Sequence, residues 1–424
     1  MIMAVKLGSS PLPPPLMGMT VAKKRGSVRV LLGCNKTGAD TGSAGGFPSF
    51  LPKEVEKIKD PFARSLAQRI ERLPVKVGFS ESCIMSSCVK PLIQSDINPV
   101  VLLHCFDSSC LEWRCTYPLL EEAGLEAWAI DVLGWGFSDL ERLPPCNVAS
   151  KRYHLYQLWK SYIKRPMILV GPSLGAAVAI DFAENHPEAV EKLVLINASV
   201  YAEGTGNLSR LPRMLAYAGV SLLKSFPLRL YANTLAFNGI SLATSLDWTN
   251  VGRLHCLLPW WEDATVNFMI SGGYNVIAQI KQLKQKALII CSERDQIVNY
   301  KQAVRLQLEL QDASMRLIPD CGHLPHVDKS SSVARFIAEF ARGDCNRGTF
   351  ADFAETYISK LDYDYFFYRD YDYFFYRQVS LKMNYDQWRS QEVLFGGATI
   401  NINHISKQQK TQEEEKNSYH YHYL

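Results

Sequence analysis

A serine between two glycines is the most specific chemical signal in the sequence. Residues 171–175 read Gly-Pro-Ser-Leu-Gly. They follow an apolar run at 167–170 that is typical of a buried strand, and they precede a stretch at 174–185 with helical character. A nucleophilic serine at a tight strand-to-helix turn is presented to substrate, and flanking glycines give the backbone the room it needs. We predict that Ser173 is a catalytic nucleophile; the alternative is a purely structural turn.

A serine hydroxyl is a weak nucleophile unless a base removes its proton and an acid orients that base. After a nucleophile of this kind the acid is expected next along the chain and the histidine last. Asp295 follows the apolar run 287–290, and His323 follows the run 315–318. Both positions meet the expected order, so we predict a triad of Ser173, Asp295 and His323.

Each partner has one close competitor. Glu293 lies two residues before Asp295, and we favour Asp295 because it is further into the loop. His326 lies three residues after His323, and we favour His323 because Gly322 in front of it lets the backbone turn.

Acyl transfer also requires hydrogen-bond donors for the oxyanion that develops on the substrate. We predict one donor in the backbone N–H of Leu174, directly after the nucleophile. The second is expected in the loop after the apolar run 100–103, where residues 104–107 read His-Cys-Phe-Asp, and Phe106 is the candidate. The alternative for this loop is simple strand termination.

The elements that position these residues alternate along the chain. Short apolar runs separated by helical patterns indicate a parallel sheet with crossover helices, and strands covered on both faces are continuously apolar. Polar residues or glycine follow each run, at the strand ends where ligands bind in such sheets. The predicted strands are residues 100–103, 127–130, 167–170, 193–196, 287–290 and 315–318.

The interval 199–286 is too long for a single crossover helix. Its stretches 211–223 and 228–237 have helical periodicity, with Pro212, Pro227 and Pro259 as breaks. We predict a helical cap inserted over the carboxyl edge of the sheet. The cap tryptophans either line a hydrophobic pocket or form the core of the cap; they are Trp248, Trp260 and Trp261.

Both ends of the chain differ in composition from its centre. No acidic residue precedes Asp40, whereas several lysines and arginines do, among serines and prolines. This composition is typical of an organelle transit peptide, and an ordinary unstructured N-terminus is the alternative. We divide the chain into a leader and linker at 1–46, a catalytic domain at 47–346 and a low-complexity extension at 347–424. An octapeptide at 362–369 repeats unchanged at 370–377, and no function is assigned to it.

Composition excludes several classes of protein. The 424 residues are 47% apolar and 21% charged, with a formal net charge of +4, which suits a globular protein with a large core. Lysine and arginine are scattered, which argues against nucleic acid as a partner. The eleven cysteines form no CxxC pair, so neither a disulfide scaffold nor a zinc site is expected. The longest apolar stretch, 166–180, is too short to span a membrane.

Taken together, the motifs resemble those of the α/β-hydrolase superfamily. The resemblance covers residues 75–340 and is carried by 103–109 with Trp113 and Arg114, by 131–139, by 171–175, and by Asp295 and His323. The leader and the loop after residue 103 make the chain similar to plant plastid hydrolases of the pheophytinase and chlorophyll dephytylase type. The resemblance implies an α/β fold whose mostly parallel sheet carries helices on both faces and an inserted cap that selects the substrate.

Two departures from the family pattern stand out. Cys105 occupies a position where the family has glycine, and a side chain there is expected to alter the oxyanion loop. The residue after Gly175 is Ala176, where glycine is more common. Serine at 173, in place of aspartate, argues against the epoxide hydrolases and haloalkane dehalogenases of the superfamily.

The sequence thus predicts a plastid serine hydrolase that cleaves a hydrophobic carboxylic ester, such as a lipid, phytyl or pigment ester, without metal or organic cofactor. Peripheral membrane association is compatible with this reading. One alternative is a ligand-binding protein with little or no activity, which Cys105 would favour. Another is the same triad used for carbon–carbon cleavage, acyl transfer or halide oxidation.

Overall fold

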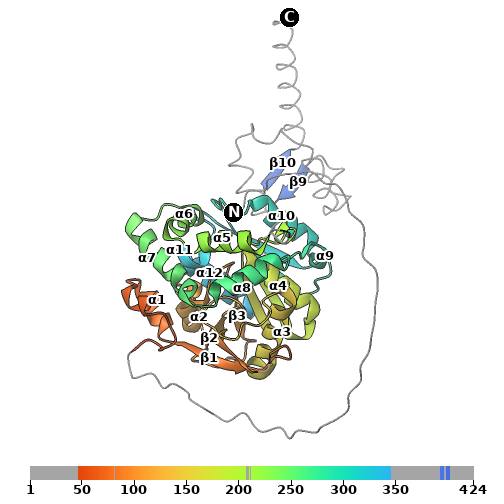
Figure 1. Ribbon diagram of the computed structural model, residues 1–424. Helices are drawn as coiled ribbons and strands as arrows, with labels where there is room; N and C mark the ends of the chain where they lie inside the picture. The colour runs from red at the N-terminus through yellow and green to blue at the C-terminus, as the bar shows by residue number, and fades with distance from the viewer. Residues whose placement is uncertain are drawn as a thin grey trace, which may run out of the picture.

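The computed structural model describes residues 46–80, 82–206, 210 and 212–344, together with two strands near the C-terminus (Figure 1). Eight strands form one sheet in the order β1-β2-β4-β3-β5-β6-β7-β8, in which β2 is antiparallel to both of its neighbours and the other pairings are parallel. The strands are β1 (Ile70–Val75), β2 (Ile84–Val89), β3 (Val100–Leu102), β4 (Ala127–Ile130), β5 (Met167–Pro172), β6 (Val190–Ile196), β7 (Lys286–Ser292) and β8 (Ala313–Ile318).

The central strands are buried on both faces, as their continuous apolar runs predict. Alternate residues of a strand point to opposite faces. In β5, Leu169 packs into one hydrophobic core, whereas Ile168 and Val170 pack into the other. In β7, Ile289 and Ile290 divide in the same way. All six predicted strands are present, and the mostly parallel sheet is confirmed.

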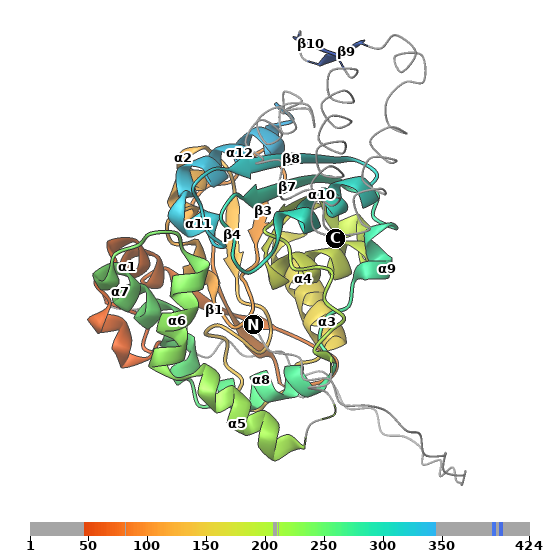
Figure 2. The ribbon, with the colours of Figure 1, turned by 90° about the horizontal axis from the view of Figure 1, so that it is seen from above.

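Helices cover both faces of this sheet (Figure 2). One face carries α3, α4 and α10, and the other carries α1, α2 and α12. The helices outside the cap are α1 (Pro61–Ala67), α2 (Tyr117–Glu122), α3 (Val148–Leu158), α4 (Leu174–Asn185), α10 (Tyr300–Glu309), α11 (Pro325–Asp328) and α12 (Ser330–Arg342).

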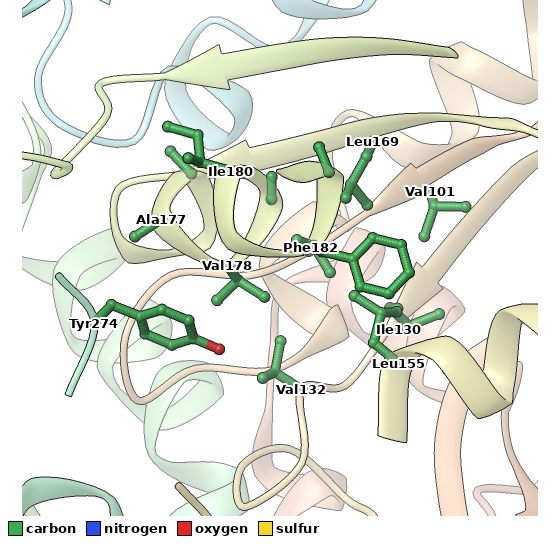
Figure 3. Close-up of a cluster of buried hydrophobic side chains, with 14 of the residues drawn as sticks. Val101, Ile130, Val132, Leu155, Leu169, Ala177, Val178, Ile180, Phe182 and Tyr274 are labelled. Carbon is green, nitrogen blue, oxygen red and sulfur yellow. The ribbon is translucent and has the colours of Figure 1, made fainter. Parts of the chain in front are cut away.

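Helix α4 is the one that begins at the predicted nucleophile, and it is buried along most of its length. Small residues such as Ala176 and Ala179, both fully buried, let it approach the sheet closely. Phe182 on α4 packs near Ile130 of β4 and Leu155 of α3 (Figure 3). This packing fixes the start of α4 relative to the end of β5.

The predicted insertion is helical and lies between β6 and β7. Pro227, predicted as a break, lies in the first turn of a helix, where its missing N–H leaves no hydrogen bond unmade. The cap helices are α5 (Arg213–Leu223), α6 (Phe226–Ala236), α7 (Leu242–Arg253), α8 (Trp261–Ile270) and α9 (Ile277–Ile280), with a 3-10 turn, η6, at Leu254–Leu257.

The first two strands of the sheet, β1 and β2, are absent from the sequence prediction. Strand β2 contains Ser86 and Ser87, which are fully buried but polar. Strand β1 lies at the edge of the sheet and contains Pro74, a residue that edge strands tolerate. Neither strand is an unbroken apolar run, so the criterion that found the parallel strands does not detect this pair.

The two ends of the chain are described only in part. The predicted leader at 1–46, apart from residue 46, and the octapeptide repeat lie outside the described residues. Within the predicted extension, β9 (Glu392–Phe395) and β10 (Ala398–Asn401) form an antiparallel pair. In the described part of the chain, no helix is long and apolar enough to cross a bilayer, and none of the nine cysteines there is in a disulfide.

Candidate active site

Ser173 lies at a strained turn between β5 and α4. Its backbone has φ 49° and ψ −117°, a conformation that L-residues rarely adopt. The turn needs both flanking glycines, because a Cβ atom at residue 171 would lie 2.2 Å from the Gly175 carbonyl oxygen. A Cβ atom at residue 175 would lie 2.7 Å from the His104 carbonyl oxygen. The local geometry is that of a nucleophile elbow.

Asp295 and His323 meet at the carboxyl ends of β7 and β8. His323 Nδ1 lies 2.7 Å from Asp295 Oδ2, and because a carboxylate only accepts, Nδ1 carries the proton. Both side chains are almost fully buried. The other carboxylate oxygen, Oδ1, accepts backbone N–H groups from Ile297 at 2.7 Å and Val298 at 2.9 Å. This arrangement leaves Nε2 of the imidazole as the atom that can accept a proton.

The two competitors have other partners. Glu293 accepts the backbone N–H of Asp320 at 3.0 Å. The imidazole of His326 is fully buried, and its Nε2 lies 2.7 Å from Glu112 Oε1. The structure therefore pairs Asp295 with His323 and His326 with Glu112.

Gly322 is required for a reason other than the predicted one. Its φ is not positive, so the backbone turn itself does not demand glycine. A Cβ atom there would lie 2.4 Å from the Ala236 carbonyl oxygen at the end of cap helix α6. The same carbonyl accepts the N–H of His323 at 2.6 Å. Glycine at 322 lets the cap approach the histidine loop closely.

Asn197, a residue that the sequence analysis missed, holds the histidine loop in place. It follows β6 with a positive φ of 41°. Its Nδ2 donates to the His323 carbonyl oxygen at 2.9 Å and to Ser292 Oγ at 2.9 Å, and its Oδ1 accepts the Ser292 N–H at 2.9 Å. The signal that could have found it is its position: Asn197 directly follows an apolar strand at the same edge of the sheet as the triad residues.

The loop after β3 contains the predicted oxyanion donor. The N–H of Cys105 is already bound, because it lies 3.2 Å from each carboxylate oxygen of Glu112. The N–H of Phe106 has no acceptor among the described residues. Leu174 is the first residue of α4, where a helix leaves its N–H groups unpaired. The two backbone groups predicted to stabilise the oxyanion thus have no acceptor within the described part of the chain.

Burial controls the ionisation of the groups around this loop. Burial raises the pKa of the Cys105 thiol well above its usual range. Burial alone would also raise the pKa of Glu112, but the hydrogen bond and charge of His326 outweigh it and lower the pKa to about 2. Glu112 is therefore a carboxylate at neutral pH, fixed between His326 and the oxyanion loop, and the Cys105 thiol is protonated.

Asp107, directly after Phe106, connects this loop to the cap. Its buried carboxylate accepts hydrogen bonds from three cap elements: Arg229 of α6, His255 of η6 at 3.0 Å and Trp261 of α8 at 2.7 Å. Burial would raise the pKa of Asp107, but the Arg229 charge and these hydrogen bonds hold it well below its usual range. The sequence analysis missed this cluster.

In the part of the chain that the structure describes, two groups of side chains bring metal-ligating atoms close together. One is Cys105, Glu112 and His326, and the other is Asp107, His255 and Cys256. The second group also binds the Arg229 guanidinium, a cation that would repel a metal ion. In the first, the carboxylate is already bound by His326 and the Cys105 N–H. Hydrogen bonding within the protein thus accounts for both groups.

A cavity of about 70 Å³ lies between the oxyanion loop and the cap. Ser108 and Glu112 contribute polar groups to it, and Phe237 and Trp248 line its apolar side. Of the other two predicted pocket tryptophans, Trp261 is almost fully buried and bound to Asp107, and Trp260 packs against both main cores. Trp248 therefore lines a cavity, whereas Trp260 and Trp261 pack in the main cores.

The fold and the elbow define the class of protein. Residues 98–330 match the family model described as alpha/beta hydrolase fold, and the chain belongs to this family. The chain is 65% identical over 306 residues to the alpha/beta hydrolase domain-containing protein VTE7 of Arabidopsis thaliana, covering 72% of this chain and 93% of that protein. It is 26% identical to a 2-hydroxy-6-oxononadienedioate/2-hydroxy-6-oxononatrienedioate hydrolase of Burkholderia vietnamiensis, covering 57% of this chain and 86% of that hydrolase.

Solved structures show the same fold. A thermophilic esterase from Thermogutta terrifontis aligns with a TM-score of 0.53 and 16% identity, over 64% of this chain and 98% of the esterase. A 2-hydroxy-6-oxo-6-phenylhexa-2,4-dienoate hydrolase from a Rhodococcus strain aligns with a TM-score of 0.53 and 19% identity, with the same coverage. The superfamily resemblance seen in the sequence is confirmed, and a plant protein is among the relatives.

Proposed function

We propose that this chain is a serine hydrolase that cleaves a hydrophobic carboxylic ester. The observation that carries the proposal is the 2.7 Å contact between His323 and Asp295, at the same sheet edge as a serine held in an elbow conformation. In the proposed reaction, Ser173 Oγ attacks the ester carbonyl while its proton passes to His323 Nε2. The N–H groups of Phe106 and Leu174 stabilise the resulting oxyanion.

The remaining steps follow from this assignment. When the tetrahedral intermediate collapses, the ester C–O bond breaks and the leaving alcohol takes the proton from His323. Water then attacks the acyl-enzyme with His323 as base, and the acid is released as Ser173 regains its proton. Asp295 keeps the imidazole in the tautomer that presents Nε2 and stabilises the imidazolium. No step calls on a metal or cofactor.

Labelling with a fluorophosphonate probe tests the proposal directly, because the probe reacts only with an activated serine. The full chain should be labelled, and both Ser173→Ala and His323→Ala should lose labelling. His186→Gln, at a half-buried histidine that stacks on Tyr156, is the matched control and should be labelled like the wild type. A folded wild-type chain without labelling would refute the hydrolase proposal and favour the ligand-binding alternative.

A second candidate function is hydrolysis of a carbon–carbon bond by the same residues. Several relatives at 22–26% identity are named as hydrolases of 2-hydroxy-6-oxo acids, compounds whose names contain no ester, including 2-hydroxy-6-oxo-2,4-heptadienoate hydrolase of Pseudomonas putida. Fluorophosphonate labelling does not separate the two reactions. The two reactions are separated by measuring, side by side on the full chain, the turnover of a long-chain nitrophenyl ester and of a ring-cleavage dienoate.

We also propose that the protein acts in a plastid. Support comes from the basic residues that precede Asp40 and from the similarity to a plant protein. A fluorescent fusion of the full chain should accumulate in chloroplasts of leaf cells, whereas a fusion that begins at residue 47 should remain outside them. Equal distribution of the two fusions would contradict this location.

A further inference from the structure

Exposed apolar side chains gather on three consecutive cap helices, α5, α6 and α7. In Figure 2 these helices run in succession along the periphery of the cap. Single exposed apolar residues are normal on protein surfaces, but a concentration of them marks an interaction site. The exposed residues include Met214, Leu215, Leu222, Leu228, Tyr231 and Leu242.

Helix α5 exposes a stripe of apolar side chains along its length. Met214, Ala218 and Leu222 are spaced four residues apart, so they lie on one face. All three are exposed, with 84% of Met214 and 64% of Leu222 accessible to solvent. A surface helix normally exposes its polar face.

Helix α5 packs on α8 beside this stripe. Val220 is buried there, and Tyr217 donates to Asp263 at 2.7 Å. The exposed Ser221 donates to Glu262, the other acidic residue in the first turn of α8. These contacts fix the rotation of α5, so the apolar face is held outward by the fold.

The following helices repeat the pattern. On α6, Leu228, Tyr231 and Ala232 are exposed and spaced three and four residues apart. On α7, Leu242 and Leu246 are exposed and spaced four apart. The apolar surface therefore extends over all three helices.

The segment that forms α5 and α6 has basic residues but no acidic ones. Between Glu203 and Asp247 the sequence has no acidic residue, whereas it has four basic ones, Arg210, Arg213, Lys224 and Arg229. Arg229 is bound to Asp107, but Arg210 and Arg213 are exposed at the start of α5. The neighbouring carboxylates, Glu262 and Asp263 on α8, are bound to Ser221 and Tyr217 of α5. Apolar side chains bordered by exposed arginines are complementary to the acyl chains and headgroups of an anionic lipid surface.

This surface is connected to the candidate active site. Helix α6 ends at Ala236, whose carbonyl oxygen accepts the N–H of His323 at 2.6 Å. A cap docked on a bilayer would therefore place the histidine loop one helix away from the lipid phase.

We infer that α5, α6 and α7 form a docking surface for an anionic lipid bilayer, with the exposed face of α5 inserted at the headgroup boundary. This inference goes beyond the proposed function, since binding to lipid does not require turnover. It explains why the fold holds apolar side chains outward where a freely soluble enzyme would expose polar ones.

Vesicle co-sedimentation of the full chain tests the inference. The probes are vesicles of phosphatidylcholine alone and vesicles of phosphatidylcholine mixed with phosphatidylglycerol. The wild type should bind the mixed vesicles more tightly, and added salt should weaken that binding. The variant Leu215→Ser/Leu222→Ser should lose about tenfold or more of its affinity for the mixed vesicles. The variant Arg210→Glu/Arg213→Glu should remove the preference for the anionic lipid.

Leu92→Ser is the matched control, because Leu92 is 75% exposed but lies outside the cap. It should bind like the wild type, and thermal unfolding should show that every variant is folded. Equal vesicle binding by the wild type and the α5 variants would overturn the inference. A second result would also overturn it: the wild type does not bind vesicles, and light scattering shows that it is a dimer whereas the α5 variants are monomers. A second copy of the chain would then cover this face.

Discussion

Replacing Asp107 by asparagine should destabilise the protein by about 3–5 kcal/mol, the cost of leaving one member of a buried ion pair without its partner. The Asp107 carboxylate is almost fully buried and accepts hydrogen bonds from Arg229, His255 and Trp261. Asparagine keeps the volume and tolerates the positive φ of 52° at this position, so the backbone should not change. What is lost is the negative charge opposite the largely buried Arg229 guanidinium.

A double-mutant cycle separates this charge effect from general damage. Arg229→Met in the Asp107→Asn background removes the unpaired cation, so it should recover stability, with a coupling energy of about 2 kcal/mol or more. The free energies come from urea unfolding at neutral pH. Glu339→Gln is the control, since it breaks an exposed pair with Arg335 on α12 and should cost at most about 0.5 kcal/mol.

Two results would refute the reasoning. A loss below about 1 kcal/mol for Asp107→Asn would mean that the ion pair is effectively solvated. A coupling energy near zero would mean that Asp107 and Arg229 act independently. Because Phe106 precedes Asp107, the variant should also slow fluorophosphonate labelling relative to Glu339→Gln, which would link the cap to the proposed oxyanion site.

Three further predictions concern single residues. Gly322→Ala should lose about 1–3 kcal/mol of stability and most of its fluorophosphonate labelling, because the new Cβ would lie 2.4 Å from the Ala236 carbonyl oxygen. Gly219→Ala, in open space on α5, is the control and should be neutral or stabilising. Equal losses of stability in the two variants would contradict the packing argument. Burial lowers the pKa of His154 from 6.5 to about 4, so the unfolded chain binds this proton more readily than the native chain. The free energy of unfolding should therefore fall as the pH drops from 6.5 toward 4. Urea unfolding at a series of pH values should show a shallower fall for His154→Gln, and parallel curves for wild type and variant would show that His154 does not cause the fall. Burial raises the pKa of Cys105 well above its usual range and that of Cys321 to about 12. Mass spectrometry should therefore find neither thiol alkylated by iodoacetamide in the native chain at neutral pH. Rapid modification of either thiol would show that its surroundings open.

The strands that carry the candidate site could be predicted because they are buried on both faces. Burial on both sides demands an unbroken apolar run, and each such run ends where the sheet ends. Asp295 and His323 each follow such an apolar run by a few residues, so they could be placed in the loops at the ends of two strands. The same reasoning did not detect β1 and β2, because β2 buries the hydroxyls of Ser86 and Ser87, which are satisfied by His154 and Asp131 far along the chain.

The polar connections between cap and core could not be predicted, because they join distant parts of the sequence. Asp107 and Arg229 are separated by 122 residues, and Asp107 and His255 by 148. Nothing in the local sequence around His255 distinguishes a buried ion-pair partner from a packing histidine. Gly322 shows a related case: glycine was recognised as necessary, but the neighbour that makes it necessary lies on a helix of the cap.

The hydrogen bond from the His323 N–H to the Ala236 carbonyl oxygen ties the motion of the cap to one amide of the candidate catalytic loop. If the cap and the sheet domain open together, this amide exchanges its proton with solvent only as often as the whole domain unfolds. If the cap lifts by itself, the amide exchanges at the rate of that smaller opening. The hydrogen-exchange rate of the His323 amide thus reports how often the cap opens, and it can be measured at this single backbone position without substrate.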